Sequence, residues 1–193
     1  MKSETGVITM FGKYSVHFEY HKKEGANKTA IMVNGALATT TSFSQSIRNL
    51  RDHANIVLFD LPFAGRSREH NTNTSGVLSK DDEVEILLYL IEYFKVNFMI
   101  SASWGGVASL LSLARRPATI EKAVILSFSP VINDAMYSYM IKARRFLCDQ
   151  DIPGGARLLN STGESISRAC LKFTIINTCC RWFRVTSSRS CFI

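Results

Sequence analysis

The sequence predicts an α/β fold in which a mostly parallel sheet has helices on both faces. Short apolar segments rich in β-branched residues recur along the chain, and segments with the apolar spacing of a helix separate them. Segments that are apolar throughout are typical of strands buried on both faces, and strands that alternate with helices form doubly wound sheets. With 193 residues, 46% of them hydrophobic, the chain is large enough for one domain with a substantial core, which excludes disordered and fibrous classes.

The predicted elements follow one another in a regular order. A hairpin around Gly12 opens the chain, because apolar residues alternate from Val16 to Tyr20. Buried strands are expected at 30–34, 55–60, 96–101 and 123–128, and helices at 42–53, 80–93, 104–115 and 134–148. The helix over 80–93 has the clearest pattern, since its apolar residues share one face and acidic residues fill its first turn, where the helix dipole favours negative charge.

Charge and cysteine are concentrated near the C-terminus. Residues 1–164 contain 18 basic and 16 acidic side chains, whereas residues 165–193 contain five basic side chains, no acidic one and four of the five cysteines. Because the first 164 residues are near neutral, the net charge of +7 gives little support to nucleic-acid binding. The odd number of cysteines and the polar N-terminus lead us to expect a cytoplasmic protein, not a disulfide-bonded secreted one. The uncharged segment Phe98–Ala114 is too short to span a membrane.

The segment Ser101–Gly106 lies where the third buried strand passes into a helix. It is a variant of the nucleophile elbow, in which small residues two positions before and after a serine allow a strained strand-to-helix turn. Here those residues are Ser101 and Gly105, and Ser103 would present its hydroxyl as the nucleophile. The Trp104 amide and the helix dipole would stabilise an oxyanion. The alternative interpretation is a small-residue packing site between a strand and a helix.

Two other turns follow buried strands and are expected at the same edge of the sheet. The first is Asn34-Gly35-Ala36, whose Ala36 amide would be the second oxyanion donor, with Asn34 and Gly35 shaping the site. The second starts at Asp60 and contains Pro62 and Gly65. We interpret Asp60 as a residue that shapes the floor of the site, not as a catalytic acid.

Four segments together resemble one family: Val33–Phe43, Val57–Asn71, Lys80–Leu88 and Ser101–Gly106. They are similar to the hydroxyalkanoyloxy-alkanoate synthases of rhamnolipid biosynthesis, which belong to the α/β-hydrolase superfamily. The resemblance covers about residues 5–162. It implies an incomplete α/β-hydrolase domain over 1–162 that lacks the last strands and includes the start of a lid at about 131–162.

The resemblance also implies an activity. Such an enzyme is an acyltransferase that joins two 3-hydroxyacyl units, drawn from thioesters of acyl carrier protein or coenzyme A, into the lipid precursor of rhamnolipids. Ser103 would be acylated, and the hydroxyl of a second hydroxyacyl unit would then attack the acyl-enzyme. No cofactor and no metal are implied.

The histidines all precede Ser103; they are His17, His21, His53 and His70. In this fold the catalytic triad follows the chain order serine, acid, histidine. We therefore expect the chain to carry the nucleophile without its acid and base, and to be inactive. His70, in a polar loop after the Asp60 turn, is the histidine to consider as a substitute base.

The last 31 residues are expected to be an aberrant basic, cysteine-rich tail translated out of frame. Read one base out of register with freely chosen synonymous codons, 163–168 can encode Gly-Lys-Tyr-Leu-Pro and 173–179 can encode His-Asn-His-Gln-His-Met, both of which resemble the synthase family at this point. We infer a frameshift near Thr162–Gly163 and predict that 163–193 adds no strand beside 123–128. The alternative is a divergent basic tail.

Two other functions remain open. One is a serine esterase or thioesterase of the same fold, which the elbow alone does not exclude. The other is a non-catalytic remnant that binds acyl chains. The products formed with and without a hydroxyacyl acceptor would separate the first from an acyltransferase, and heat protection by an acyl thioester without turnover would support the second.

Overall fold

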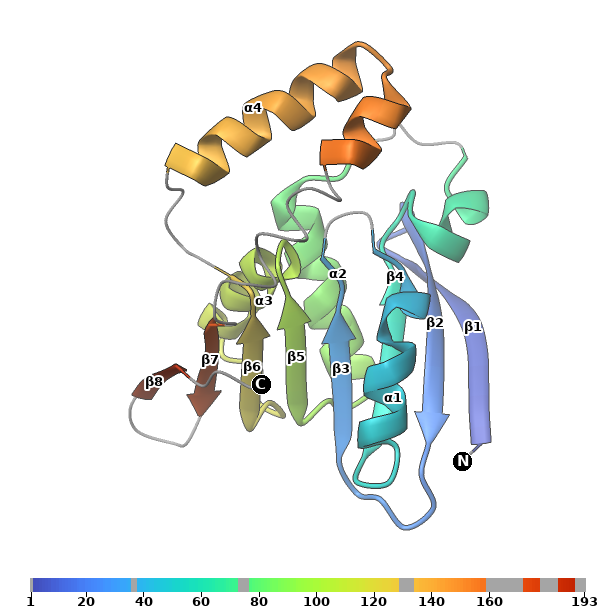
Figure 1. Ribbon diagram of the computed structural model, residues 1–193. Helices are drawn as coiled ribbons and strands as arrows, with labels where there is room; N and C mark the ends of the chain where they lie inside the picture. Colours follow the sequence, from blue (N-terminus) through green and yellow to red (C-terminus); the bar gives the residue numbers. More distant parts are fainter. Residues whose placement is uncertain are drawn as a thin grey trace.

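The computed structural model describes residues 2–35, 38–72, 77–128 and 134–158, together with the backbone of 172–177 and 184–189. Eight strands form one sheet in the order β1-β2-β4-β3-β5-β6-β7-β8 (Figure 1). The strands are β1 (Lys2–Met10), β2 (Tyr14–Lys22), β3 (Thr29–Val33), β4 (Asn55–Asp60), β5 (Phe98–Ala102), β6 (Lys122–Leu126), β7 (Lys172–Asn177) and β8 (Arg184–Arg189). The described α-helices are α1 (Ser44–Leu50), α2 (Lys80–Tyr93), α3 (Gly105–Ala114), α4 (Asp134–Cys148) and a short helix over 152–158. Two 3-10 helices are labelled η1 (Thr40–Phe43) and η2 (Gly65–His70).

The predicted parallel sheet is confirmed. β3 pairs in parallel with both β4 and β5, and β5 pairs in parallel with β6. The opening hairpin of β1 and β2 is antiparallel and joins this sheet through β4. The carboxyl ends of β3, β4, β5 and β6 therefore lie along one edge, so the turns that follow these strands come together there.

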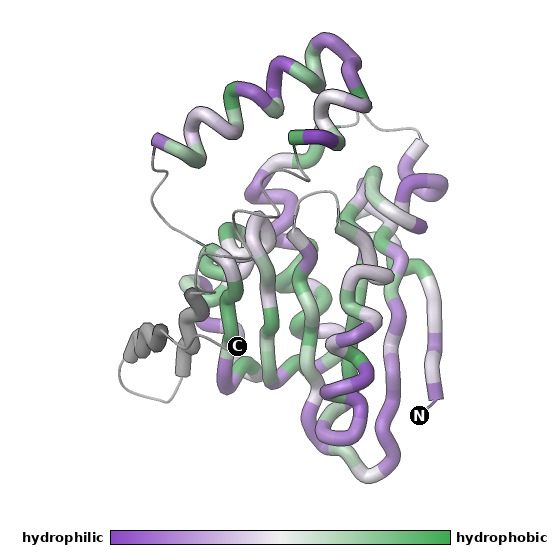
Figure 2. The backbone as a smooth tube through the Cα atoms, in the orientation of Figure 1, coloured by the Kyte–Doolittle hydropathy of each residue, from purple (hydrophilic) through white to green (hydrophobic). Residues whose placement is uncertain are grey.

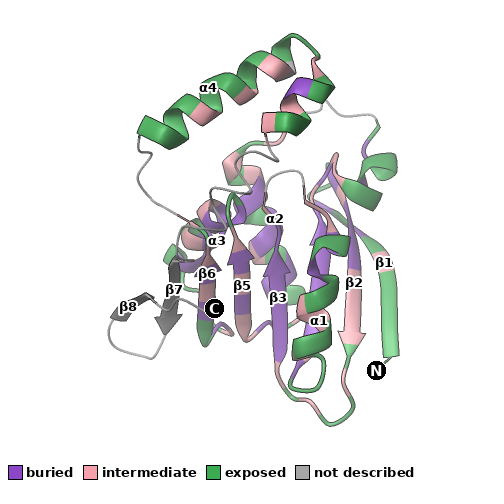
Figure 3. Ribbon diagram, viewed as in Figure 1, coloured by how far each residue is buried: buried purple, intermediate pink, exposed green. Residues whose placement is uncertain are grey.

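Helices cover both faces of the sheet. Ile31, Val57 and Met99 project toward α2 and α3 and belong to the larger apolar core. The next residues along two of the same strands, Met32 and Leu58, project to the other face and pack with the smaller core beneath α1. Figure 2 shows the apolar strands between the two helical layers, and Figure 3 shows the central strands as buried. This alternation follows from the twofold repeat of side chains along a strand.

The first turn of α2 is fixed by a capping box. The Ser79 hydroxyl accepts a hydrogen bond from the Asp82 backbone N–H at 3.0 Å, and the Asp82 carboxylate accepts one from the Ser79 N–H at 3.0 Å. The side-chain and backbone donors of Ser79 lower the pKa of Asp82 to about 2. This box satisfies free N–H groups at the helix start and holds the following turn in place.

The prediction that no strand lies beside β6 is wrong. β7 pairs with β6 in antiparallel register, from Lys122 opposite Asn177 to Leu126 opposite Phe173, and β8 pairs with β7. The edge of β6 offers unpaired N–H and C=O groups, and an extended segment satisfies them without needing the apolar period of a core strand. In the described part of the chain, every strand beyond β6 is antiparallel to its neighbour, unlike the parallel strands from β3 to β6.

α4 and the helix over 152–158 lie above the carboxyl ends of the strands (Figure 1). They occupy the described part of the predicted lid. Phe146 packs where Gly154 has no side chain, since a Cβ at Gly154 would lie 2.5 Å from its ring. Neither these helices nor any other helix in the described ranges is long and apolar enough to cross a membrane.

Candidate active site

Ser103 occupies a strained turn between β5 and α3. Its φ is +52°, in the left-handed region that residues with a Cβ seldom adopt. Two hydrogen bonds hold the turn: the Ser103 N–H donates to the Leu126 carbonyl at 2.9 Å, and the Gly106 N–H donates to the Ser103 carbonyl at 2.9 Å. The Ser103 residue itself is exposed. The backbone is thus fixed on both sides while the hydroxyl remains open to a substrate, as a nucleophile elbow requires.

The residues two positions on either side of Ser103 are small for different reasons. A Cβ on Gly105 would collide with the Asn34 carbonyl oxygen and would lie 3.0 Å from that of Val33, so only glycine allows α3 to start this close to β3. Ser101 is fully buried in β5, opposite Val33 on one side and Ile125 on the other. Its hydroxyl has no hydrogen-bond partner within the described ranges.

The turn after β3 lies against Ser103. A Cβ on Gly35 would be 3.3 Å from the Ser103 Cβ and 3.8 Å from its Oγ. The neighbouring Asn34 is buried, and its side-chain amide donates to the Phe59 carbonyl at 3.3 Å, which connects this turn to the end of β4. Ala36 lies outside the described residues, so its amide stays a predicted oxyanion donor.

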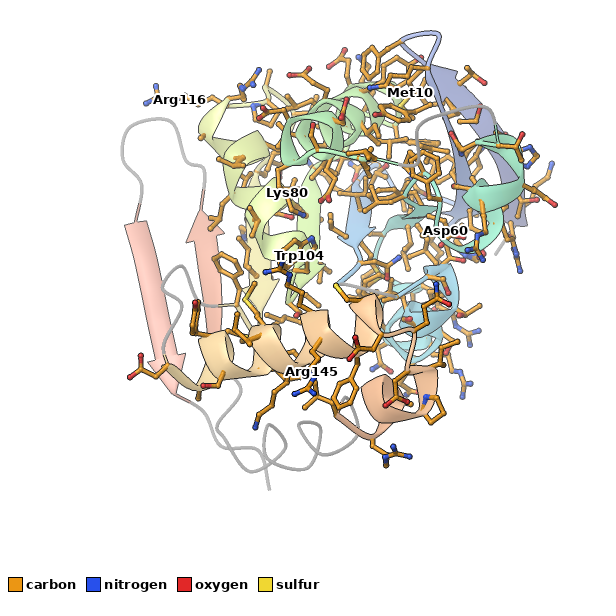
Figure 4. All side chains as sticks on the ribbon, turned by 90° about the horizontal axis from the view of Figure 1, so that it is seen from above. Met10, Asp60, Lys80, Trp104, Arg116 and Arg145 are labelled. Atoms are coloured by element: carbon orange, nitrogen blue, oxygen red, sulfur yellow. The ribbon has the colours of Figure 1, made fainter. Side chains whose placement is uncertain are left out.

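Trp104 starts α3 with helical backbone angles, φ −54° and ψ −33°. In the portion of the chain with defined positions, no hydrogen-bond acceptor is paired with the Trp104 N–H. An amide at the start of a helix, one residue after the nucleophile, is suited to hold a developing negative charge. Trp104 is 45% exposed, and the Lys80 ammonium lies above its indole, 4.3 Å from the ring centroid (Figure 4).

Asp60 joins two loops beneath the site. It is fully buried, and its two carboxylate oxygens accept hydrogen bonds from the Thr40 N–H at 2.8 Å and the Arg66 N–H at 2.9 Å. Gly65 follows with a φ of +46°, and a Cβ there would overlap the Asp60 carboxylate. The Ser67 hydroxyl donates to the Asp60 carbonyl at 2.5 Å. These contacts occupy the carboxylate with backbone donors, which is the arrangement expected of a residue that shapes the site floor.

None of the four histidines is hydrogen-bonded to Ser103, and all five residues are described. His17 lies on β2, opposite Asp60 in the register, and β2 is separated from β5 by β4 and β3. At about 4.8 Å per strand, this places the His17 backbone roughly 14 Å from β5. Burial, followed by the nearby Arg66 cation, lowers the pKa of His17. His70 pairs with Glu69 on the surface, at 3.4 Å.

Sequence reasoning did not identify the contact between Lys80 and Trp104. The two residues are far apart in the sequence, and nothing in the local pattern of either segment links them. It also did not predict the conformation of Phe63, which has a φ of +68° and packs edge-on against Tyr14 with ring centroids 6.5 Å apart. For the contact between Lys80 and Trp104, the available sequence signal was a tryptophan directly after the candidate nucleophile.

No known protein-family model matches the sequence. Over 162 residues, 84% of this chain, it is 44% identical to the (R)-3-hydroxydecanoyl-ACP:CoA transacylase of Pseudomonas aeruginosa and 43% identical to the protein of the same name from Pseudomonas putida. These alignments cover 54% and 55% of the relatives, so the chain spans about half the length of the curated relatives it matches.

Solved structures support the fold. An enzyme described as recognising and cleaving the ring of the Pseudomonas quinolone signal superposes with a TM-score of 0.64 at 17% identity, over 82% of this chain and 57% of that one. An α/β hydrolase from Sphaerobacter thermophilus superposes with a TM-score of 0.61 at 17% identity, over 82% of this chain and 60% of that one.

Proposed function

We propose that this chain, which has the α/β-hydrolase fold and is a homologue of the 3-hydroxydecanoyl transacylases, carries the nucleophile half of an acyltransferase site for 3-hydroxyacyl thioesters. The observation that carries the proposal is the position of Ser103 on a left-handed turn, with Gly35 packed against it and α3 starting directly behind it. A serine held in this way is suited to attack a carbonyl carbon.

The first step transfers an acyl group to the protein. The Ser103 Oγ attacks the thioester carbonyl, and the C–S bond breaks as the carrier thiol leaves with a proton. The Trp104 N–H, together with the predicted Ala36 N–H, would stabilise the oxyanion of the tetrahedral intermediate. The product is an ester between Ser103 and the 3-hydroxyacyl group.

The second step depends on the acceptor. In the proposed reaction the hydroxyl of a second 3-hydroxyacyl unit attacks the acyl-enzyme, which forms the dimeric ester precursor of rhamnolipids and returns the proton to Ser103. The names of the curated relatives instead describe transfer from acyl carrier protein to coenzyme A, in which a thiol is the acceptor. Both reactions share the acylated serine and differ only in the second nucleophile.

We propose that a polypeptide of these 193 residues does not complete this cycle. A serine hydroxyl of ordinary acidity needs a base to remove its proton, and no histidine follows Ser103 in the sequence. In the structure His17 and His70 are engaged with Arg66 and Glu69 respectively. The acid and the base would correspond to the half of the relatives that this chain does not match.

The out-of-frame origin of the tail remains part of the proposal. The alignments with the relatives span 162 residues, so 31 residues of the chain are unmatched. The deciding observation is the coding DNA: translation in the alternative frame after the Thr162 codon should continue the similarity to the transacylases. An alternative frame that shows no such similarity would contradict the frameshift.

The activity is tested with purified protein and 3-hydroxydecanoyl thioesters of acyl carrier protein and coenzyme A. We expect the frame-restored protein to form the dimeric ester or to exchange the acyl group between carriers, and the 193-residue chain to do neither. Ser103→Ala in the restored protein is the matched control and should remove both reactions. Release of free acid without transfer would support a serine esterase or thioesterase instead, and equal turnover by the 193-residue chain would identify His70 as the first candidate base.

A further inference from the structure

The Trp104 side chain is connected to α2 through two charged residues. The Lys80 ammonium lies 4.3 Å from the centroid of the Trp104 ring and 2.6 Å from the Glu83 carboxylate. Lys80 and Glu83 are both on the first turns of α2, and Trp104 is the residue after Ser103. Figure 4 shows Lys80 and Trp104 close together on the side of the molecule over which α4 crosses.

Burial fixes this series of contacts from the α2 end. Glu83 is only 8% exposed, and a carboxylate with so little access to water is stabilised by a cation partner. The ion pair therefore restricts Lys80, whose side chain would otherwise sample many rotamers. The capping box of Ser79 and Asp82 fixes the backbone of the same turn. A cation held over one face of an indole attracts the ring and favours one position of the exposed side chain.

We propose that Glu83 and Lys80 are positioning residues that hold the Trp104 indole beside Ser103 as a contact surface for the apolar acyl chain of the thioester. The inference rests on the proposed function for the chemical class of the substrate. Lys80 covers one face of the ring, and the 45% exposure of Trp104 leaves apolar surface next to the nucleophile. An apolar chain bound near Ser103 would remove this surface from water.

Tryptophan fluorescence tests the inference without turnover. The chain has two tryptophans, so Trp182→Phe leaves Trp104 as the single reporter. Titration of this protein with 3-hydroxydecanoyl-coenzyme A should change the Trp104 emission. Lys80→Met, which keeps the apolar stem and removes the charge, should weaken binding about 3- to 5-fold and increase acrylamide quenching of Trp104. Lys80→Arg, which keeps a cation for both partners, should restore the affinity to within about twofold.

The controls separate positioning from a purely structural role. Coenzyme A without an acyl group should bind equally to the parent and to Lys80→Met, because it lacks the apolar chain. Lys80→Gln keeps a donor to Glu83 without a charge and replaces Lys80→Met if that variant does not fold. A loss of thermal stability with unchanged quenching and unchanged acyl affinity would overturn the positioning role alone.

The same titration distinguishes this inference from the proposed function. Ser103→Ala should bind the acyl thioester as tightly as the parent, since the indole contact does not require the nucleophile. Absence of binding by the parent protein would overturn both the substrate class and the role of Trp104. Binding by the parent without acyl transfer in the frame-restored enzyme would refute the proposed reaction and leave the indole contact standing.

Discussion

Replacement of Gly105 by alanine should destabilise the protein through a clash of backbone with backbone. The added Cβ would meet the Asn34 carbonyl oxygen, and it would lie 3.0 Å from the Val33 oxygen and 3.1 Å from the Asn34 carbonyl carbon. These are backbone atoms of the last residue of β3 and of the residue that follows it, so they cannot move without shifting the strand end. The φ of Gly105 is not in the left-handed region, so alanine would add no backbone strain there. The loss of stability would come from the clash alone, because alanine is favoured over glycine within a helix such as α3.

The expected magnitude follows from these opposing effects. Overpacking against a rigid neighbour costs about 1–3 kcal/mol, and alanine in a helix returns about 0.5–1 kcal/mol. Because no flexible side chain can absorb the clash, we place Gly105→Ala at the upper end, with a net loss of about 2 kcal/mol. For a protein of this size, that corresponds to a decrease of roughly 1 M in the urea midpoint.

Two further glycines provide graded controls in the same urea assay. A Cβ on Gly106 would lie 2.6 Å from the Phe128 ring, a side chain that can rotate, so Gly106→Ala should cost about 1 kcal/mol. A Cβ on Gly155 would meet only the Phe146 Cβ at 3.8 Å, an ordinary contact, so Gly155→Ala should be neutral or slightly stabilising. If Gly105→Ala proves as stable as Gly155→Ala, the close approach of α3 to β3 is not what requires glycine at this position.

Three other predictions concern the site and its supports. Ser103→Gly should be about 1 kcal/mol more stable than Ser103→Ala in urea denaturation, because glycine adopts a φ of +52° without strain; equal stability would argue against the strained turn. Asp60→Asn should cost about 2 kcal/mol, since an amide accepts through only one of the two positions that now receive backbone N–H groups, and unfolding measurements that find no loss would contradict the two-loop role. The pKa of Asp82, lowered to about 2 mainly by hydrogen bonds from Ser79, should rise toward 3.8 in Ser79→Ala when followed by NMR titration. Because the folded pKa is the lower one, this contribution to stability is present above pH 3.8 and is lost as the pH falls through about 2, and an unchanged Asp82 titration would refute the capping assignment.

The parts of the fold that depend on local pattern could be predicted from the sequence. β3, β4, β5 and β6 were expected to within two residues at most of their ends, because each is a short apolar run between polar turns. The meeting of Gly35 with Ser103 was also expected, since the turns that follow parallel strands gather at one edge. The helix that was expected at 42–53 is shorter in the structure: α1 spans Ser44–Leu50, and a 3-10 turn precedes it.

The parts that depend on contacts between distant segments could not. The cation–π pair of Lys80 and Trp104 requires the packing of α2 beside α3, which no local pattern specifies. Phe63 has a positive φ, which is usually found at glycine and is unfavourable for a residue with a side chain. The packing of its ring against Tyr14 offsets this backbone strain. β7 was missed because backbone pairing at an open edge does not depend on side-chain period.

The contacts that hold Ser103 all come from one continuous part of the chain. Its turn is anchored by the end of β3, by β6 through the Leu126 carbonyl, and by α3, all of which lie between Thr29 and Leu126. Every described contact that sets the Ser103 backbone is thus made by residues no later than 126. The described contacts that fix the Ser103 turn therefore need no residue from the part of the relatives that this chain does not match.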